Sequence, residues 1–108
     1  MSVAVTGMGI ICAIGRGADE VWENLANNRS GIGPAEGLNT PLSKTHVFGQ
    51  IKLTNSQFIA DIDEDSKGLS RTSLLSIVAI KEALASSGVS AQDVDGLVSG
   101  TTVGGMDR

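Results

Sequence analysis

The chain opens with Val3-Ala4-Val5-Thr6-Gly7-Met8-Gly9-Ile10-Ile11-Cys12-Ala13-Ile14-Gly15, an uncharged run that glycines interrupt. Its first half combines valines with a β-branched threonine, which predicts a buried strand over residues 2–7 that ends at Gly7. Glycines at positions 7 and 9 also indicate that the backbone approaches another part of the protein closely. This strand is therefore expected to be the first element of the core.

A strand followed by glycines is also how a dinucleotide-binding loop begins. In that loop the helix starts inside the glycine motif, so that its N-terminus meets the pyrophosphate. Here Cys12 stands at the third glycine position, and a helix is predicted to start only near Ala18. The spacing argues against nucleotide binding, and a nucleotide-binding module remains as the less favoured alternative.

The residues after Gly17 predict a first helix over residues 18–27. Asp19 and Glu20 would complement the helix dipole at its start. The apolar face of this helix would consist of Val21, Trp22 and Leu25. An amphipathic helix of this kind is expected to cover one side of a core.

The middle of the chain carries weaker signals. Residues 30–45 are rich in glycine and proline without periodicity, which predicts a loop. Apolar and polar side chains alternate over residues 47–53, which favours an exposed strand. Residues 55–69 are rich in polar side chains and are predicted to form a surface segment that is partly helical.

A second helix is predicted between Ser70, a good N-cap residue, and Gly88, a good C-terminal cap. Its apolar residues lie nearly all the way round, so burial on more than one side is expected. A turn over residues 89–95 and a third strand over residues 96–103 follow. Strands alternating with helices predict an α/β fold, a parallel or mixed sheet with helices on its faces.

Composition excludes several classes of function. The chain has 108 residues, of which 41% are hydrophobic and 19% charged, and its net charge is −4. So few basic residues predict no nucleic-acid partner. We also expect no membrane span, no signal peptide and no internal disulfide, because no apolar stretch is long enough and Cys12 is the single cysteine. A cytoplasmic location is expected.

Few residues are candidates for chemistry. Cys12 is expected to be a small buried hydrophobe, and His46 a surface or capping residue. A group of acidic residues lacks the glycine and the final glutamate of an EF-hand loop, which indicates a solvated segment: Asp61, Asp63, Glu64 and Asp65. No catalytic residue, metal ligand or cofactor-binding residue is predicted in the chain.

Three separated segments together resemble the β-ketoacyl-acyl carrier protein synthases, the condensing enzymes of the thiolase superfamily. The opening is similar to the family's first strand and helix at Val3, Val5, Thr6, Gly7, Gly9, Gly15, Asp19, Glu20 and Trp22, with Ser30-Gly31-Ile32 after it. The other two segments are Leu69-Ser70-Arg71-Thr72, at a helix entry, and Gly100-Thr101-Thr102-Val103-Gly104-Gly105, at a strand exit. The resemblance covers the whole chain in register.

The resemblance implies that residues 1–108 are an incomplete N-terminal portion of a thiolase-like domain. The whole enzyme would be an acyltransferase that extends acyl chains by decarboxylative Claisen condensation of acyl and malonyl thioesters, in fatty acid, polyketide or polyene synthesis. Its cysteine nucleophile and histidines lie downstream in the family, so the chain alone would be inactive. The alternative within the family is a non-catalytic ketosynthase-like partner subunit.

The resemblance also implies partners and one substrate contact. Acyl carrier protein, the remainder of the polypeptide and a second subunit, identical or ketosynthase-like, are the expected partners, and no cofactor is expected. In the family the residue three places into G-x-x-x-G-G lines the acyl pocket. That residue is Val103 here. Glycines 100, 104 and 105 would otherwise permit a tight turn or, alternatively, cradle a phosphate.

Overall fold

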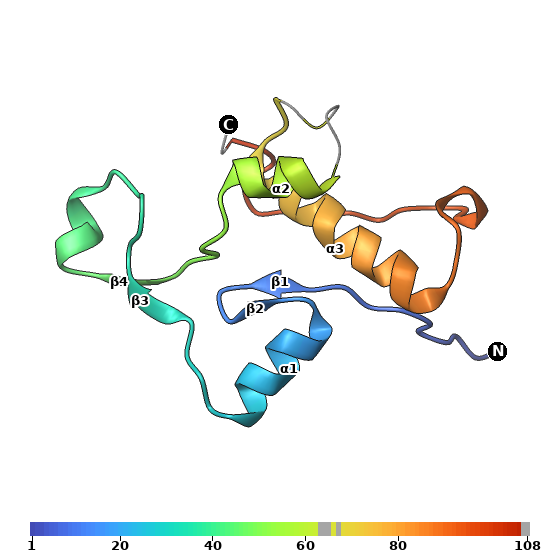
Figure 1. The fold of residues 1–108 in the computed structure, drawn as a ribbon. Helices are drawn as coiled ribbons and strands as arrows, with labels where there is room; N and C mark the ends of the chain where they lie inside the picture. The colour runs from blue at the N-terminus through green and yellow to red at the C-terminus, as the bar shows by residue number, and fades with distance from the viewer. Residues whose placement is uncertain (63–65, 67, 107–108) are drawn as a thin grey trace. The chain divides into compact units, whose positions relative to one another are not determined.

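The computed structural model describes residues 1–62, 66 and 68–106. The chain forms two compact units, which are described one at a time: Met1–Gly9 with Thr54–Arg108, and Ile10–Leu53. Their helices and short strands are shown in Figure 1. The chain is thus a mixture of α and β elements, as the sequence predicts.

The unit of residues 10–53 contains a hairpin, a helix and a second strand pair. Its elements are β1 (Ile11–Cys12), β2 (Gly15–Arg16), α1 (Ala18–Ala26), β3 (Ile32–Pro34), the 3-10 helix η1 (Pro41–Lys44) and β4 (Val47–Gly49). Strands β1 and β2 pair antiparallel, and so do β3 and β4. The predicted helix over residues 18–27 is confirmed by α1, with Asp19 and Glu20 in its first turn.

The other unit is built on two helices, α2 (Asn55–Ile62) and α3 (Arg71–Ser87), followed by the 3-10 helix η3 (Ala91–Asp93). Both predicted caps of α3 are confirmed. The Ser70 hydroxyl accepts a hydrogen bond from the Ser73 amide at 3.2 Å. Gly88 takes the left-handed conformation with φ of 71°, and its amide donates to the Leu84 carbonyl.

The core of this unit is small and lies between α2 and α3. Phe58 and Leu74 have no exposed surface, and Val78 is buried beside them. The Arg71 guanidinium lies over the Phe58 ring, 5.5 Å from its centroid, and donates to the Asn55 side chain at 2.8 Å. One aromatic ring therefore joins the first turns of the two helices.

The N-terminal segment lies along α3 through glycines. A Cβ atom at Gly9 would collide with the Ala79 carbonyl and come within 3.0 Å of the Ala83 amide nitrogen. Between Gly7 and Gly9, the Met8 amide donates to Ser86 Oγ at 3.0 Å, and the Ser86 hydroxyl donates to the Met8 carbonyl at 3.2 Å. The close approach predicted for these glycines is confirmed, and its partner is a helix.

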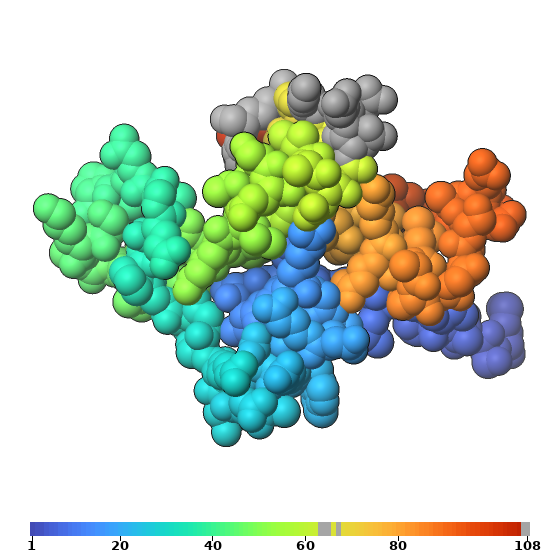
Figure 2. Space-filling model, viewed as in Figure 1, coloured from blue at the N-terminus to red at the C-terminus, as the bar shows by residue number. Residues whose placement is uncertain are grey.

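The predicted strands over residues 2–7 and 96–103 are wrong for this structure. Neither segment forms a strand, residues 102–103 bend into a turn, and no strand partner lies beside either segment among the described residues. Side chains that would be buried in a sheet are exposed to solvent: Val3 is 92% exposed, Val5 85% and Val98 100%. Figure 2 shows the N-terminal segment in dark blue, open on the face in view. A strand needs a neighbour to satisfy its main chain, which apolar patterning alone does not supply.

Other boundaries differ as well. The predicted strand over residues 47–53 is limited to β4, and the predicted loop over residues 30–45 contains β3 and η1. The two ladders are antiparallel pairs, so the parallel or mixed sheet is not formed by the described residues. Helix α3 buries Leu74 and Val78, while Ile80 on another side is 39% exposed. The expected burial on more than one side is therefore incomplete.

Candidate functional site

The Gly100–Gly105 segment forms a tight turn beside the first turns of α3. Gly104 and Gly105 take positive φ values of 58° and 83°, which L side chains rarely adopt. A Cβ atom at Gly105 would lie 3.4 Å from Ser70 Oγ, the capping atom of α3. Glycine is thus needed here for turn geometry and close packing, as one of the two interpretations predicts.

Val103 stands inside this turn with its main chain held on both sides. Its amide donates to Thr101 Oγ1 at 3.2 Å, and its carbonyl accepts from the Met106 amide at 3.1 Å. Its side chain is 39% exposed. The turn presents Val103 at the surface of its unit, where a ligand or further polypeptide can reach it.

A hollow of about 340 Å³ adjoins the turn. One wall is α3 and the other is the 99–105 segment, and the lining residues are Thr72, Ser73, Ser76, Ile77, Ser99, Gly100, Thr101, Gly104 and Gly105. Val103 is not among them. Most of the lining side chains carry hydroxyl groups. The glycine pattern of residues 100–105 does not predict this lining, because the α3 residues lie about 25 positions earlier in the sequence.

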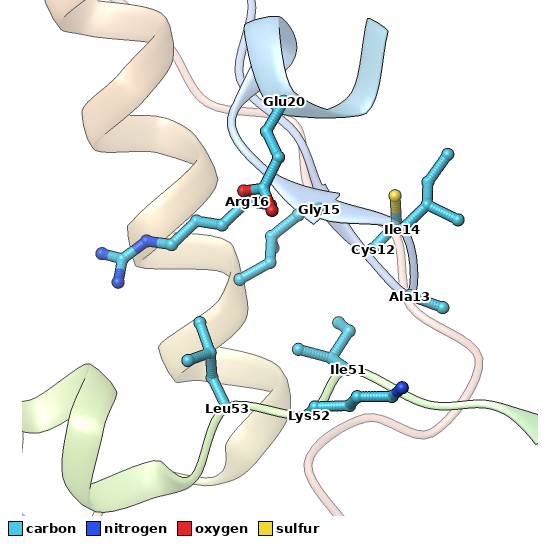
Figure 3. Close-up of a pocket in the computed structure, with 10 residues that line it drawn as sticks. Cys12, Ala13, Ile14, Gly15, Arg16, Glu20, Ile51, Lys52 and Leu53 are labelled. Carbon is cyan, nitrogen blue, oxygen red and sulfur yellow. Dashed lines mark hydrogen bonds between the residues drawn. The ribbon is translucent and has the colours of Figure 1, made fainter. Parts of the chain in front are cut away.

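A second hollow, of about 410 Å³, lies within the unit of residues 10–53. Hairpin residues and the 51–53 segment line it, and Figure 3 shows Ile51 and Leu53 directed toward the hairpin. The Glu20 carboxylate accepts a hydrogen bond from the Arg16 amide at 3.0 Å. Cys12, half-buried, belongs to this hollow, so the expectation of a buried small hydrophobe is met only in part.

The hairpin around Cys12 is braced from two sides. The Asn24 side-chain amide donates to the Ile14 carbonyl, and Arg29 donates to the Asn24 side-chain oxygen at 3.0 Å. A Cβ atom at Gly31 would collide with Ala13. Gly31 therefore fixes the chain after α1 against the hairpin turn.

No histidine is among the described residues that line the hollow of Cys12. His46 instead shares a hydrogen bond of 2.8 Å with the Thr45 hydroxyl through its Nδ1 atom, consistent with a surface or capping role. Of the acidic group, Asp61 lies in α2, and residues 63–65 lie outside the described residues. Within residues 1–62, 66 and 68–106, no three metal-ligating side chains form a cluster.

The profile of one protein family, described as "Beta-ketoacyl synthase, N-terminal domain", matches residues 1–108. The chain belongs to this β-ketoacyl synthase family. The resemblance seen in three sequence segments is thereby confirmed over the whole chain. No solved structure matches the chain significantly.

Curated relatives agree with this assignment. Nodulation protein E of Rhizobium meliloti is 35% identical over 105 residues, which cover 94% of this chain and 25% of that protein. The 3-oxoacyl-[acyl-carrier-protein] synthase 1 of Escherichia coli (strain K12) is 30% identical over 86 residues, covering 80% of this chain and 21% of the enzyme. The chloroplastic 3-oxoacyl-[acyl-carrier-protein] synthase II of Arabidopsis thaliana is 31% identical over 112 residues, which cover 96% of this chain and 20% of that enzyme.

This β-ketoacyl synthase chain thus spans a quarter or less of the length of these relatives. None of the helices in the described part of the chain is long and apolar enough to cross a membrane.

Proposed function

We propose that residues 1–108 form the N-terminal part of a β-ketoacyl-acyl carrier protein synthase with a thiolase-like fold. The whole enzyme takes an acyl chain from acyl carrier protein onto a cysteine thiolate. Malonyl-acyl carrier protein then loses carbon dioxide, and the resulting carbanion attacks the acyl thioester. Preorganised donors and histidines from further polypeptide stabilise the charge that develops, without a cofactor.

The observation that carries this proposal is the family match over residues 1–108. The bare apolar segments support the sheet of a larger domain, because extended chain with exposed valines is stable only when further strands pair with it. An apolar hollow of about 430 Å³ supports it too. Its lining includes Ile80, Leu84, Val94 and Leu97, with Thr6 and Gly7. A larger thiolase-like domain, a mixed sheet with helices on its faces, would fill such a hollow.

Cys12 is not the nucleophile in this proposal. It lies in the hairpin of β1 and β2, and its hollow is lined by no histidine among the described residues, whereas the resemblance implies a cysteine that acts with histidines from further along the polypeptide. We therefore expect the 108-residue chain alone to remain unacylated by acyl-acyl carrier protein and to release no carbon dioxide from malonyl-acyl carrier protein. Intact-protein mass spectrometry and carbon dioxide release measure these two outcomes. Acylation that Cys12→Ala abolishes would contradict the proposal.

The natural protein provides the direct test of the reaction. With acyl-acyl carrier protein it should form an acyl-enzyme at a cysteine other than Cys12, and with malonyl-acyl carrier protein it should yield a product two carbons longer. Acyl carrier protein, a second subunit and a cytoplasmic location belong to the same proposal. A protein that is never acylated but copurifies with an active ketosynthase would instead be the non-catalytic partner subunit.

Val103 is the acyl-chain contact in this proposal. Its position in the Gly100–Gly105 turn, partly exposed and held at both main-chain groups, suits a residue that limits the length of a bound chain. In the natural protein Val103→Phe should shorten the longest accepted acyl chain while the shortest condensation stays nearly intact. Each methylene denied burial costs about 0.8 kcal/mol, so a few carbons change preference by roughly tenfold or more.

The measurement is kcat/KM for a series of acyl donors of rising length. Val47→Phe serves as the matched control, because it adds the same bulk at a residue of β4 that is 67% exposed. Equal losses for short and long donors with Val103→Phe would make Val103 a structural residue. An unchanged length profile would remove it from the acyl pocket.

A further inference from the structure

Thr101 holds the turn that carries Val103 through a single oxygen atom. Thr101 Oγ1 accepts hydrogen bonds from the Val103 amide at 3.2 Å and from the Gly104 amide at 3.3 Å. Both donors belong to consecutive residues, so the two bonds fix the direction of the peptide plane between them. One hydroxyl therefore sets the orientation of the Val103 main chain and, through it, the direction of the Val103 side chain.

The same threonine also faces α3 across the hydroxyl-rich hollow. Thr101 lines the hydroxyl-rich hollow together with Ser76 and Ile77 of that helix. Its neighbour Thr102 forms no hydrogen bond with any described residue and does not line that hollow. Adjacent threonines of the same sequence motif thus have different environments, and only Thr101 both accepts hydrogen bonds within the turn and lines the hollow beside α3.

Removing the Thr101 hydroxyl leaves two main-chain donors without their acceptor. Such donors turn toward water or another acceptor, because an unsatisfied amide is costly. The glycines that follow offer little resistance, since Gly104 and Gly105 can adopt many conformations. Because these glycines are flexible, loss of the Thr101 oxygen should let the Val103 main chain and side chain change direction.

We propose that Thr101 is a positioning residue that sets acyl-chain-length preference through Val103, without touching the acyl chain itself. This inference rests on the proposed function, in which Val103 contacts that chain. The sequence motif draws attention to Val103 and the glycines. The hydrogen bonds instead indicate that Thr101 fixes the geometry of the turn in which they lie.

The test compares three variants of the natural protein. Thr101→Val keeps the shape and removes the acceptor, Thr101→Ser keeps the acceptor, and Thr102→Val is the matched control. The readout is the ratio of kcat/KM for a long and a short acyl donor. We expect Thr101→Val to change this ratio by about fivefold, the worth of a typical net hydrogen bond. Thr101→Ser and Thr102→Val should stay near the parent ratio.

A second arm tests the route through Val103. In a variant that already carries Val103→Ala, position 103 has no branched side chain for Thr101 to orient. Adding Thr101→Val to that variant should therefore no longer change the ratio of kcat/KM for long and short donors. Amide hydrogen exchange adds a measurement that needs no variant. The Val103 and Gly104 amides should be protected in the natural protein, and rapid exchange at both would overturn the proposal even if Thr101→Val does not fold.

The outcomes separate this proposal from the one on which it depends. If Val103→Phe shifts the length profile and Thr101→Val does not, Thr101 is not a positioning residue and the acyl contact stands. If neither substitution shifts the profile, the acyl contact at Val103 fails, and the positioning role fails with it. A change of ratio by Thr102→Val equal to that by Thr101→Val would also contradict the proposal.

Discussion

Replacing Phe58 by alanine is expected to lower the free energy of unfolding by about 3 to 5 kcal/mol, the usual cost of emptying a buried aromatic site. Phe58 has no exposed surface and packs with Leu74 in the core between α2 and α3. The substitution also removes the ring beneath the Arg71 guanidinium, 5.5 Å away. Urea unfolding followed by circular dichroism measures the loss.

Phe48→Ala is the matched control for this substitution. Phe48 lies in β4, opposite Gly33, and is only half-buried. Removing its ring should cost less, because less apolar surface returns to water and no closed cavity is left. Equal costs for the two alanine variants would show that the ring between α2 and α3 is not the centre of this core.

Adding a single methyl group at Gly9 should also destabilise the protein strongly. A Cβ atom there would collide with the Ala79 carbonyl and approach the Ala83 amide nitrogen to 3.0 Å. Because helix main chain cannot move aside as a flexible side chain does, the N-terminal segment has to lift from α3. We expect Gly9→Ala to cost about 1 to 3 kcal/mol, the range for overfilling a packed site.

Gly96→Ala provides the comparison for Gly9→Ala. A Cβ atom at Gly96 would meet nothing within 4 Å, and its φ is not positive. The same methyl group should therefore be neutral or slightly stabilising there, since alanine restricts the unfolded chain. Hydrogen exchange at the Met8 amide gives a local readout, because that amide donates to Ser86 Oγ. An unchanged exchange rate in Gly9→Ala would contradict close packing at this point.

The helices could be predicted from sequence because their signals are local. Ser70 and Gly88 cap α3 through hydrogen bonds to residues three or four positions away. The strands over residues 2–7 and 96–103 could not be predicted in the same way. Their apolar pattern states which side chains avoid water, but a ladder also needs a second strand at the right distance.

Only an outline of the candidate site can be predicted from sequence, and the role of Val103 stays a prediction. The position of Val103 follows from the family resemblance, and the need for Gly104 and Gly105 follows from their positive φ values. The role of Thr101 as a hydrogen-bond acceptor could not be predicted, because Thr101 and Thr102 are adjacent residues of the same type and the sequence does not distinguish them. Nor does the sequence show that Ser76 of α3 lies across a hollow from Thr101.

The exposed valines at positions 3 and 5 also bear on how the chain behaves when it is concentrated. Their extended segment forms no main-chain hydrogen bonds with other parts of the described chain. Such an edge is a template on which another molecule can add a strand, and each added molecule presents the next free edge. A partner that covers this segment should therefore keep concentrated molecules from adding strands to one another.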